Sequence, residues 1–150
     1  MSDSRIAAGI RVGTVAAAAT IGAVIGLGLR HGLALRPFIS AGRALLERIG
    51  VSGTPSASAV VGLSMAACAI IVLGVCFTVV AAPLRGLRLL GVAIVFGAIA
   101  WSVSAFVMPS ILAWSSGGVL GSAQRLFIFG MLTIALVAGM RLARSSIQID

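Results

Sequence analysis

The sequence contains no lysine, asparagine or tyrosine, and Asp3, Glu47 and Asp150 are its only acidic residues. Charged residues make up 9% of its 150 residues, whereas a soluble globular chain carries about 25%. Hydrophobic residues make up 60%, and the mean hydropathy is +1.20. So little polar surface cannot cover a water-soluble core. The composition excludes a soluble enzyme and a disordered tail, and it predicts an integral membrane protein in contact with the lipid bilayer.

The net charge of +8 comes from arginine alone, and a strongly basic chain raises the question of a nucleic-acid partner. The eleven arginines lie at the ends of apolar runs rather than together in one polar segment. That distribution is typical of residues that flank membrane spans and touch headgroup phosphates. We therefore expect no nucleic-acid partner.

The two cysteines, Cys68 and Cys76, lie in one apolar run. In a helix their Cα atoms would be about 12 Å apart, whereas a disulfide needs a separation below about 7 Å. We predict that they do not pair with each other. The sequence also shows no nucleophile–base pair, no metal-ligand cluster and no phosphate-binding loop, so it predicts neither catalytic nor metal-binding residues.

Long apolar runs set the expected fold. In lipid every backbone polar group must be satisfied within the segment, so only helices and closed barrels span a membrane. The runs are far longer than the roughly ten residues of a barrel strand and do not alternate. They predict an all-α membrane protein, a single-domain bundle of four transmembrane helices. The expected helices cover about 10–30, 58–83, 89–114 and 119–142.

The fourth run is short, because only 15 uncharged residues follow Arg125 before the next arginine. A helix that spans the bilayer must therefore begin near residue 119 and carry Arg125 a turn or two inside it. Glu47 falls on the same side as Arg125 in a four-span topology. We predict that Glu47 helps to neutralise Arg125, with Arg43 and Arg48 as competitors for the carboxylate.

The segment 37–49, between the first two spans, is amphipathic. A helix over this segment has an apolar side, which consists of Phe38, Ala41, Leu45 and Ile49. Its opposite side is polar and carries Ser40, Arg43 and Glu47. Pro37 suits the first helical position, and Gly50 suits the residue just past the end. The pattern predicts a short interfacial helix on the bilayer surface. The alternative is an irregular polar loop.

Four spans would put the N-terminus, the second connection and the C-terminus on one side of the membrane. That side holds six arginines, Arg5, Arg11, Arg85, Arg88, Arg141 and Arg144. The other side holds five, Arg30, Arg36, Arg43, Arg48 and Arg125. The positive-inside rule favours a cytoplasmic N-terminus by this one residue. A composition rich in Ala, Gly, Val and Arg suggests a bacterial genome, so we expect the bacterial inner membrane.

Small residues recur at helical spacing in the first two spans. The first span carries Thr14, Ala18, Gly22 and Gly26. The second carries Ser58, Gly62, Ala66, Gly74 and Thr78. Small faces let helix backbones approach closely, and such packing drives association in lipid. The two strips indicate either an interface with other subunits or packing between helices of the same chain.

A few polar residues could serve a ligand or a solute. His31, the only histidine, could bind a haem or a pigment as cofactor, although its place at a helix end favours an interfacial polar residue. Ser102 and Ser104, beside Trp101, could line a polar path, although serine in a membrane helix usually bonds to its own backbone.

The sequence best fits a non-catalytic membrane subunit with an accessory or structural role. We expect it to pack through its small-residue faces against partner membrane chains or against copies of itself. One alternative is a small oligomeric channel or transporter for a neutral or anionic solute. Another is a pigment- or haem-associated subunit of an electron-transfer complex, which would need His31 as a ligand.

Overall fold

The computed structural model describes residues 3–30, 35–103 and 122–147, and every regular element in these ranges is a helix. The helices are α1 (Asp3–Arg30), α2 (Arg36–Arg48), α3 (Pro55–Ala81), α4 (Leu87–Ser102) and α6 (Ser122–Ile147). Three of them are long and apolar enough to cross a membrane, over Ile6–Arg30, Pro55–Ala81 and Ala123–Arg144. α4 is a shorter apolar helix of 16 residues.

Local sequence signals explain where the helices begin and end. The Thr54 hydroxyl accepts a hydrogen bond from the Ala57 amide at 3.3 Å, and Pro55 occupies the first turn of α3. α3 ends at Ala81, two residues before Pro83. Gly86 then turns the chain into α4 with a φ of 59°, a conformation that other residues adopt only at a cost.

The structure extends the helix expected over 10–30 back to Asp3, because a helix can continue into the headgroup region through Arg11. The helix expected over 37–49 is α2, which ends at Arg48, so that Ile49 lies beyond it and is 64% exposed. The later parts of the expected helix 89–114 and the first residues of 119–142 lie outside the described residues.

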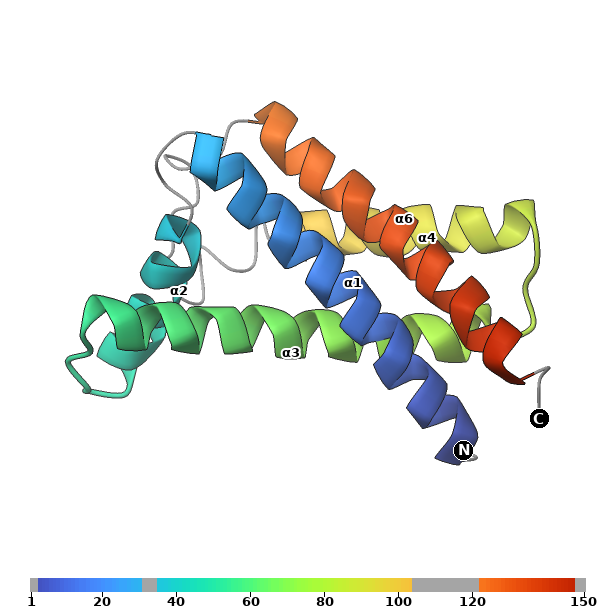
Figure 1. Ribbon diagram of the computed structural model, residues 1–150, viewed down its shortest axis with the longest axis horizontal. Coiled ribbons are helices and arrows are strands. Elements are labelled where there is room, and N and C mark those ends of the chain that lie inside the picture. Colours follow the sequence, from blue (N-terminus) through green and yellow to red (C-terminus); the bar gives the residue numbers. More distant parts are fainter. Residues whose placement is uncertain (1–2, 31–34, 104–121, 148–150) are drawn as a thin grey trace.

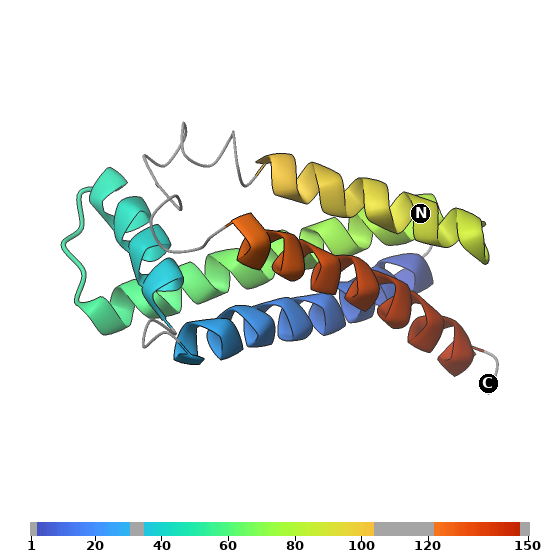
Figure 2. The same cartoon turned by 90° about the horizontal axis from the view of Figure 1, so that it is seen from above.

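α1 and α6 lie side by side and cross α3 at an angle, with α4 on the opposite side of α6 from α1 (Figures 1 and 2). α2 lies across the N-terminal end of α3 (Figure 1). The described N- and C-terminal ends of the chain lie at the same end of the bundle as the α3–α4 turn. The other end of the bundle holds α2, the C-terminal end of α1 and the beginning of α6.

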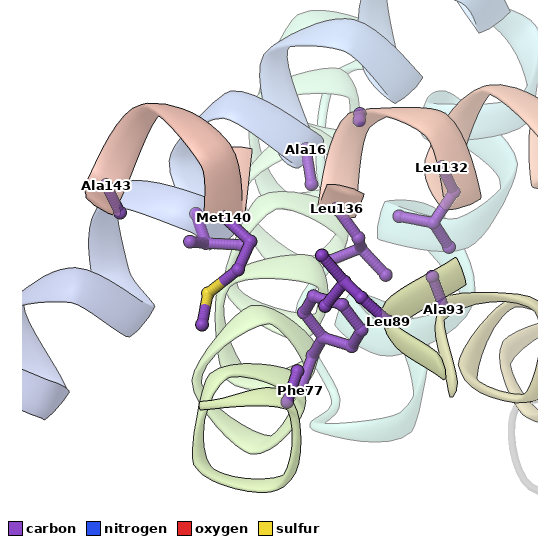
Figure 3. Close-up of a cluster of buried hydrophobic side chains, with 11 residues drawn as sticks. Ala16, Phe77, Leu89, Ala93, Leu132, Leu136, Met140 and Ala143 are labelled. Carbon is purple, nitrogen blue, oxygen red and sulfur yellow. The ribbon is translucent and has the colours of Figure 1, made fainter. Parts of the chain in front are cut away.

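The core gathers apolar side chains from four helices at the end near the α3–α4 turn. Phe77 of α3 and Leu136 of α6 are fully buried, and the Phe77 ring meets the Phe96 ring edge-on at a centroid distance of 5.5 Å. Leu89 of α4 and Met140 of α6 belong to the same cluster (Figure 3). These side chains fix how α4 and α6 pack against α3.

Most of the surface of the long helices is apolar. Only 17% of the apolar window of α3 is buried inside the chain. Val60 and Val72 on α3 and Ile134 on α6 each expose more than 60% of their area. A water-soluble protein does not present apolar surface on this scale. The three long apolar helices are those of a membrane-embedded protein, in which lipid tails cover these side chains.

Candidate functional site

The strip of small residues on α3 packs against other helices of the same chain. Ser58, Gly62, Gly74 and Thr78 are buried, and Ala66 is half-buried. A Cβ on Gly74 would collide with the Cα of Gly13 on α1, and a Cβ on Gly62 would collide with the carbonyl oxygen of Phe38 on α2. These positions have to be glycine because helix backbones touch there.

The contact of α2 with α3 is equally close. Gly42 is buried, and a Cβ there would collide with the carbonyl oxygen of Ser58. Phe38 and Ala41 are also buried against α3, whereas Leu45 is only half-buried. α2 is therefore fixed to α3 by backbone contact as well as by apolar side chains.

The strip of small residues on α1 faces outward, away from the other described helices. Thr14, Ala18, Gly22 and Gly26 are all exposed, and a Cβ on Gly22 or Gly26 would meet nothing within 4 Å. The Thr14 hydroxyl donates to the Ile10 carbonyl of its own helix at 2.8 Å. This strip is an unoccupied small-residue face on the described surface of the chain.

α1 contacts its neighbours through a different set of small residues. A Cβ on Gly13 would lie 2.6 Å from the Cα of Ile71, and one on Gly9 would lie 2.8 Å from the Cα of Val75. This second face lies outside the two strips predicted from the sequence. Gly9 and Gly13 are four residues apart, so the same spacing rule could have found them.

An apolar cavity of about 340 Å³ lies among all five described helices, towards the end of the bundle that holds α2. Its walls are almost entirely apolar, and they include Ile21 of α1, Phe38 of α2, Leu73 of α3, Ala100 of α4 and Phe129 of α6. The cavity is partly open to the surroundings, so a ligand could enter it.

Two polar residues lie in the cavity wall. Arg125, half-buried in the first turn of α6, contributes the one charged side chain among the described residues that line the cavity. Thr20 of α1 is 7% exposed, and its hydroxyl finds no hydrogen-bond partner among the described residues. The helical threonines Thr78 and Thr133, by contrast, donate to the carbonyl four residues earlier.

The Glu47 carboxylate, expected to neutralise Arg125, accepts a hydrogen bond from Nε of Arg43 at 2.8 Å. The two side chains are 61% and 71% exposed and are one turn apart on α2. The expected competitor Arg43 thus holds the carboxylate, and Arg125 lies against the apolar cavity.

The remaining candidate residues are placed as follows. His31 and Ser104 lie outside the described residues. The Ser102 hydroxyl, at the end of α4, donates to the Ala98 carbonyl at 2.9 Å. Cys68 and Cys76 are free thiols exposed on α3. Within the described ranges, no three His, Cys, Asp or Glu side chains gather closely enough to hold a metal ion.

Arg144 has a role that the sequence did not suggest. Its Nη2 donates to the carbonyl oxygens of Ala81 and Ala82 at 3.0 Å each and to that of Leu84 at 2.7 Å. The last carbonyls of a helix have no partner within the helix, and the negative end of its dipole favours a cation. Arg144 of α6 therefore caps α3.

The chain matches no protein-family model, no curated protein and no solved structure.

Proposed function

We propose that the protein is a non-catalytic membrane subunit that packs through the outward strip of α1 against another membrane chain or a second copy of itself. The observation that carries this proposal is the exposure of Thr14, Ala18, Gly22 and Gly26 along one face of a long apolar helix. In lipid, helices associate through small residues that let backbones come close.

The chain's own packing supports this reading. Gly13 with Gly74, Gly62 with Phe38, and Gly42 with Ser58 all join helices by backbone contact. The outward strip has the same composition and spacing, and a helix from another chain could pack on it in the same way. Large side chains such as Val60 of α3 suit lipid instead.

The topology that accompanies this proposal has four spans and an interfacial helix. α4, with the apolar residues that follow it in sequence, would make up the third span. α2 would lie at the bilayer surface, with Arg43 and Glu47 towards water. The arginine balance favours a cytoplasmic N-terminus in the bacterial inner membrane.

The test is association of the full chain after gentle extraction from its own membranes. We expect native mass spectrometry to detect a defined complex for the wild type and its loss for the double variant Gly22→Leu/Gly26→Leu. A Cβ at either position meets no atom of the described residues within 4 Å, so we expect the thermal unfolding midpoint to stay within a few degrees. The matched control is Gly130→Leu on α6, which is also exposed and also open.

Two results would contradict the proposal. A complex that survives the double variant would place the interface elsewhere. A monomeric wild-type protein after the same extraction would show that lipid, and not another helix, covers the strip of α1.

A second candidate function is a small oligomeric channel or transporter whose pore forms only when copies of the chain assemble. Arg125 is half-buried near the beginning of α6, and its charge at such a pore would favour an anionic or neutral solute over a cation. The test is solute flux into liposomes that contain the wild type or Arg125→Ala. Flux that depends on Arg125 would support transport, and no flux from either protein would count against it.

A further inference from the structure

The cavity is suited to an apolar ligand with one polar end. Its lining comes from all five described helices, and most of it consists of Ile, Leu, Val, Ala, Met and Phe side chains. A hydrated ion or a sugar would lose its hydrogen bonds to water there and gain almost none. A hydrocarbon chain would lose nothing on entering and would gain close contacts.

The polar end of the site is set by Arg125. Its guanidinium belongs to the first turn of α6, where the helix dipole adds positive potential. A guanidinium has five N–H donors in a planar fork, so it can bind a carboxylate or phosphate while keeping a protein contact. An anionic group at this position would add a charge-assisted hydrogen bond from the arginine and would be favoured by the helix dipole.

Thr20 lies in the wall deeper in the bundle. α1 and α6 are antiparallel, and Val12 meets Gly139 where they touch. Measured along each helix from that contact, Thr20 is about 12 Å away and Arg125 about 21 Å away. The cavity wall therefore extends inward from the arginine, which matches a ligand with a charged end and a long apolar tail.

We propose that the cavity binds one acyl chain that carries an anionic headgroup, with the headgroup on Arg125 and the chain between α1, α3 and α6. A volume of about 340 Å³ is at the lower end of the roughly 300–1,000 Å³ of small-molecule sites. It therefore suits a single chain rather than the whole apolar body of a lipid with two. The source is either a free fatty acid or one chain of an acidic phospholipid. This site is separate from the outward strip of α1, so it does not depend on the proposed subunit role.

The first experiment measures the charge dependence of binding. Purified full-length protein in a non-ionic detergent is mixed with palmitate or with hexadecanol, and native mass spectrometry counts the bound molecules. Phosphatidylglycerol and phosphatidylcholine form a second pair. We expect the anionic member of at least one pair to bind about tenfold more tightly than its uncharged or zwitterionic partner. The pair that shows the preference identifies the source of the chain.

The arginine variants test whether the headgroup binds at Arg125. Arg125→Gln should remove the preference for the anionic ligand, whereas Arg141→Gln should keep it. Both residues belong to α6 and the two changes remove the same charge, but Arg141 is exposed and does not line the cavity. Equal binding of charged and uncharged ligands by the wild type would overturn the proposal. A preference that survives in Arg125→Gln would do so as well.

Two alanine positions on α4 test whether the acyl chain of the ligand lies in the cavity. Ala100→Leu adds volume inside the cavity and should weaken binding of the anionic ligand about tenfold, although Arg125 is unchanged. Ala98→Leu makes the same change two residues away, on the exposed side of α4, and should leave binding unaltered. Thermal unfolding of each variant checks that the fold is intact. Full binding by a folded Ala100→Leu variant would exclude the cavity as the site.

Discussion

The guanidinium of Arg144 donates a hydrogen bond to the carbonyl oxygen of Leu84 at 2.7 Å, across 60 residues of sequence. Ala81 and Ala82 share the same nitrogen as acceptors. A residue that the sequence marks only as a flanking charge thus joins α6 to the end of α3. The Ala81 carbonyl also accepts a hydrogen bond from the Leu84 amide at 3.0 Å, so the arginine adds to the backbone bonding of this turn and ties it to α6.

Removing this cap should destabilise the bundle. Arg144→Gln loses charge-assisted hydrogen bonds, and we expect the free energy of unfolding to fall by about 1.5 kcal/mol because the side chain is only half-buried. The thermal unfolding midpoint in detergent measures the effect. Arg141→Gln is the control, since Arg141 is exposed on the same helix. Equal losses for the two variants would show that only the net charge matters.

The contact of α1 with α3 predicts opposite effects of one substitution at two glycines. Gly13→Ala forces its Cβ against the Ile71 backbone and should cost about 2 kcal/mol of stability. In Gly22→Ala the new Cβ meets no described atom within 4 Å, so the variant should gain up to about 1 kcal/mol from helix propensity. Unfolding in a denaturing detergent compares the two. A stable Gly13→Ala variant would contradict the backbone contact.

The α2 ion pair should matter little to stability. Arg43 and Glu47 are both mostly exposed, and exposed pairs one helical turn apart contribute at most about 0.5 kcal/mol. We expect Glu47→Gln to leave the thermal midpoint unchanged to within about a degree. The earlier hypothesis of Glu47 neutralising Arg125 requires a clear fall in that midpoint, so the same measurement distinguishes the two pairings.

Replacing Ser58 with alanine should stabilise the protein. It is 1% exposed, and its hydroxyl has no hydrogen-bond partner among the described residues. Because Ser58→Ala removes a buried polar group at little cost in packing, stability should rise by about 1 kcal/mol. Ser56→Ala is the control, since that hydroxyl is exposed and 3.1 Å from the Thr54 hydroxyl. A loss of stability in Ser58→Ala would show that the hydroxyl has a partner.

The sequence predicted the helical fold from general features. Apolar length requires helices in lipid, and Pro37 and Gly50 mark the ends of the segment 37–49 through backbone geometry that depends on few neighbours. The Thr54 cap and Pro55, which the prediction did not use, begin α3 three residues before the expected residue 58. The ranges expected for α2 and α3 differ from the structure by three residues or fewer at each end. These signals are local, and that is why one sequence is sufficient to find them.

The candidate sites depend on which face of each helix meets which neighbour, and that information is not local. α1 has two small faces, one through Gly9 and Gly13 and one through Gly22 and Gly26, and spacing alone does not rank them. The long-range contacts of Arg144 and the placement of Arg125 in the cavity wall depend on how α6 packs. Charge counting could identify both arginines, but not the groups that they face.

The position of the glycine contacts along the chain has a consequence for biogenesis. In the described part of the chain, the glycine contacts that join α1 to α3 and α2 to α3 lie between Gly9 and Val75. Because a polypeptide emerges from the ribosome N-terminus first, these three helices can complete their contacts before α6 is synthesised. α6 then docks onto a preassembled unit, and Arg144 reaches its carbonyls in that step. A nascent chain that stops before α6 would leave uncovered the apolar surfaces of α1 and α4 on which α6 packs, and these surfaces would be a substrate for membrane quality control.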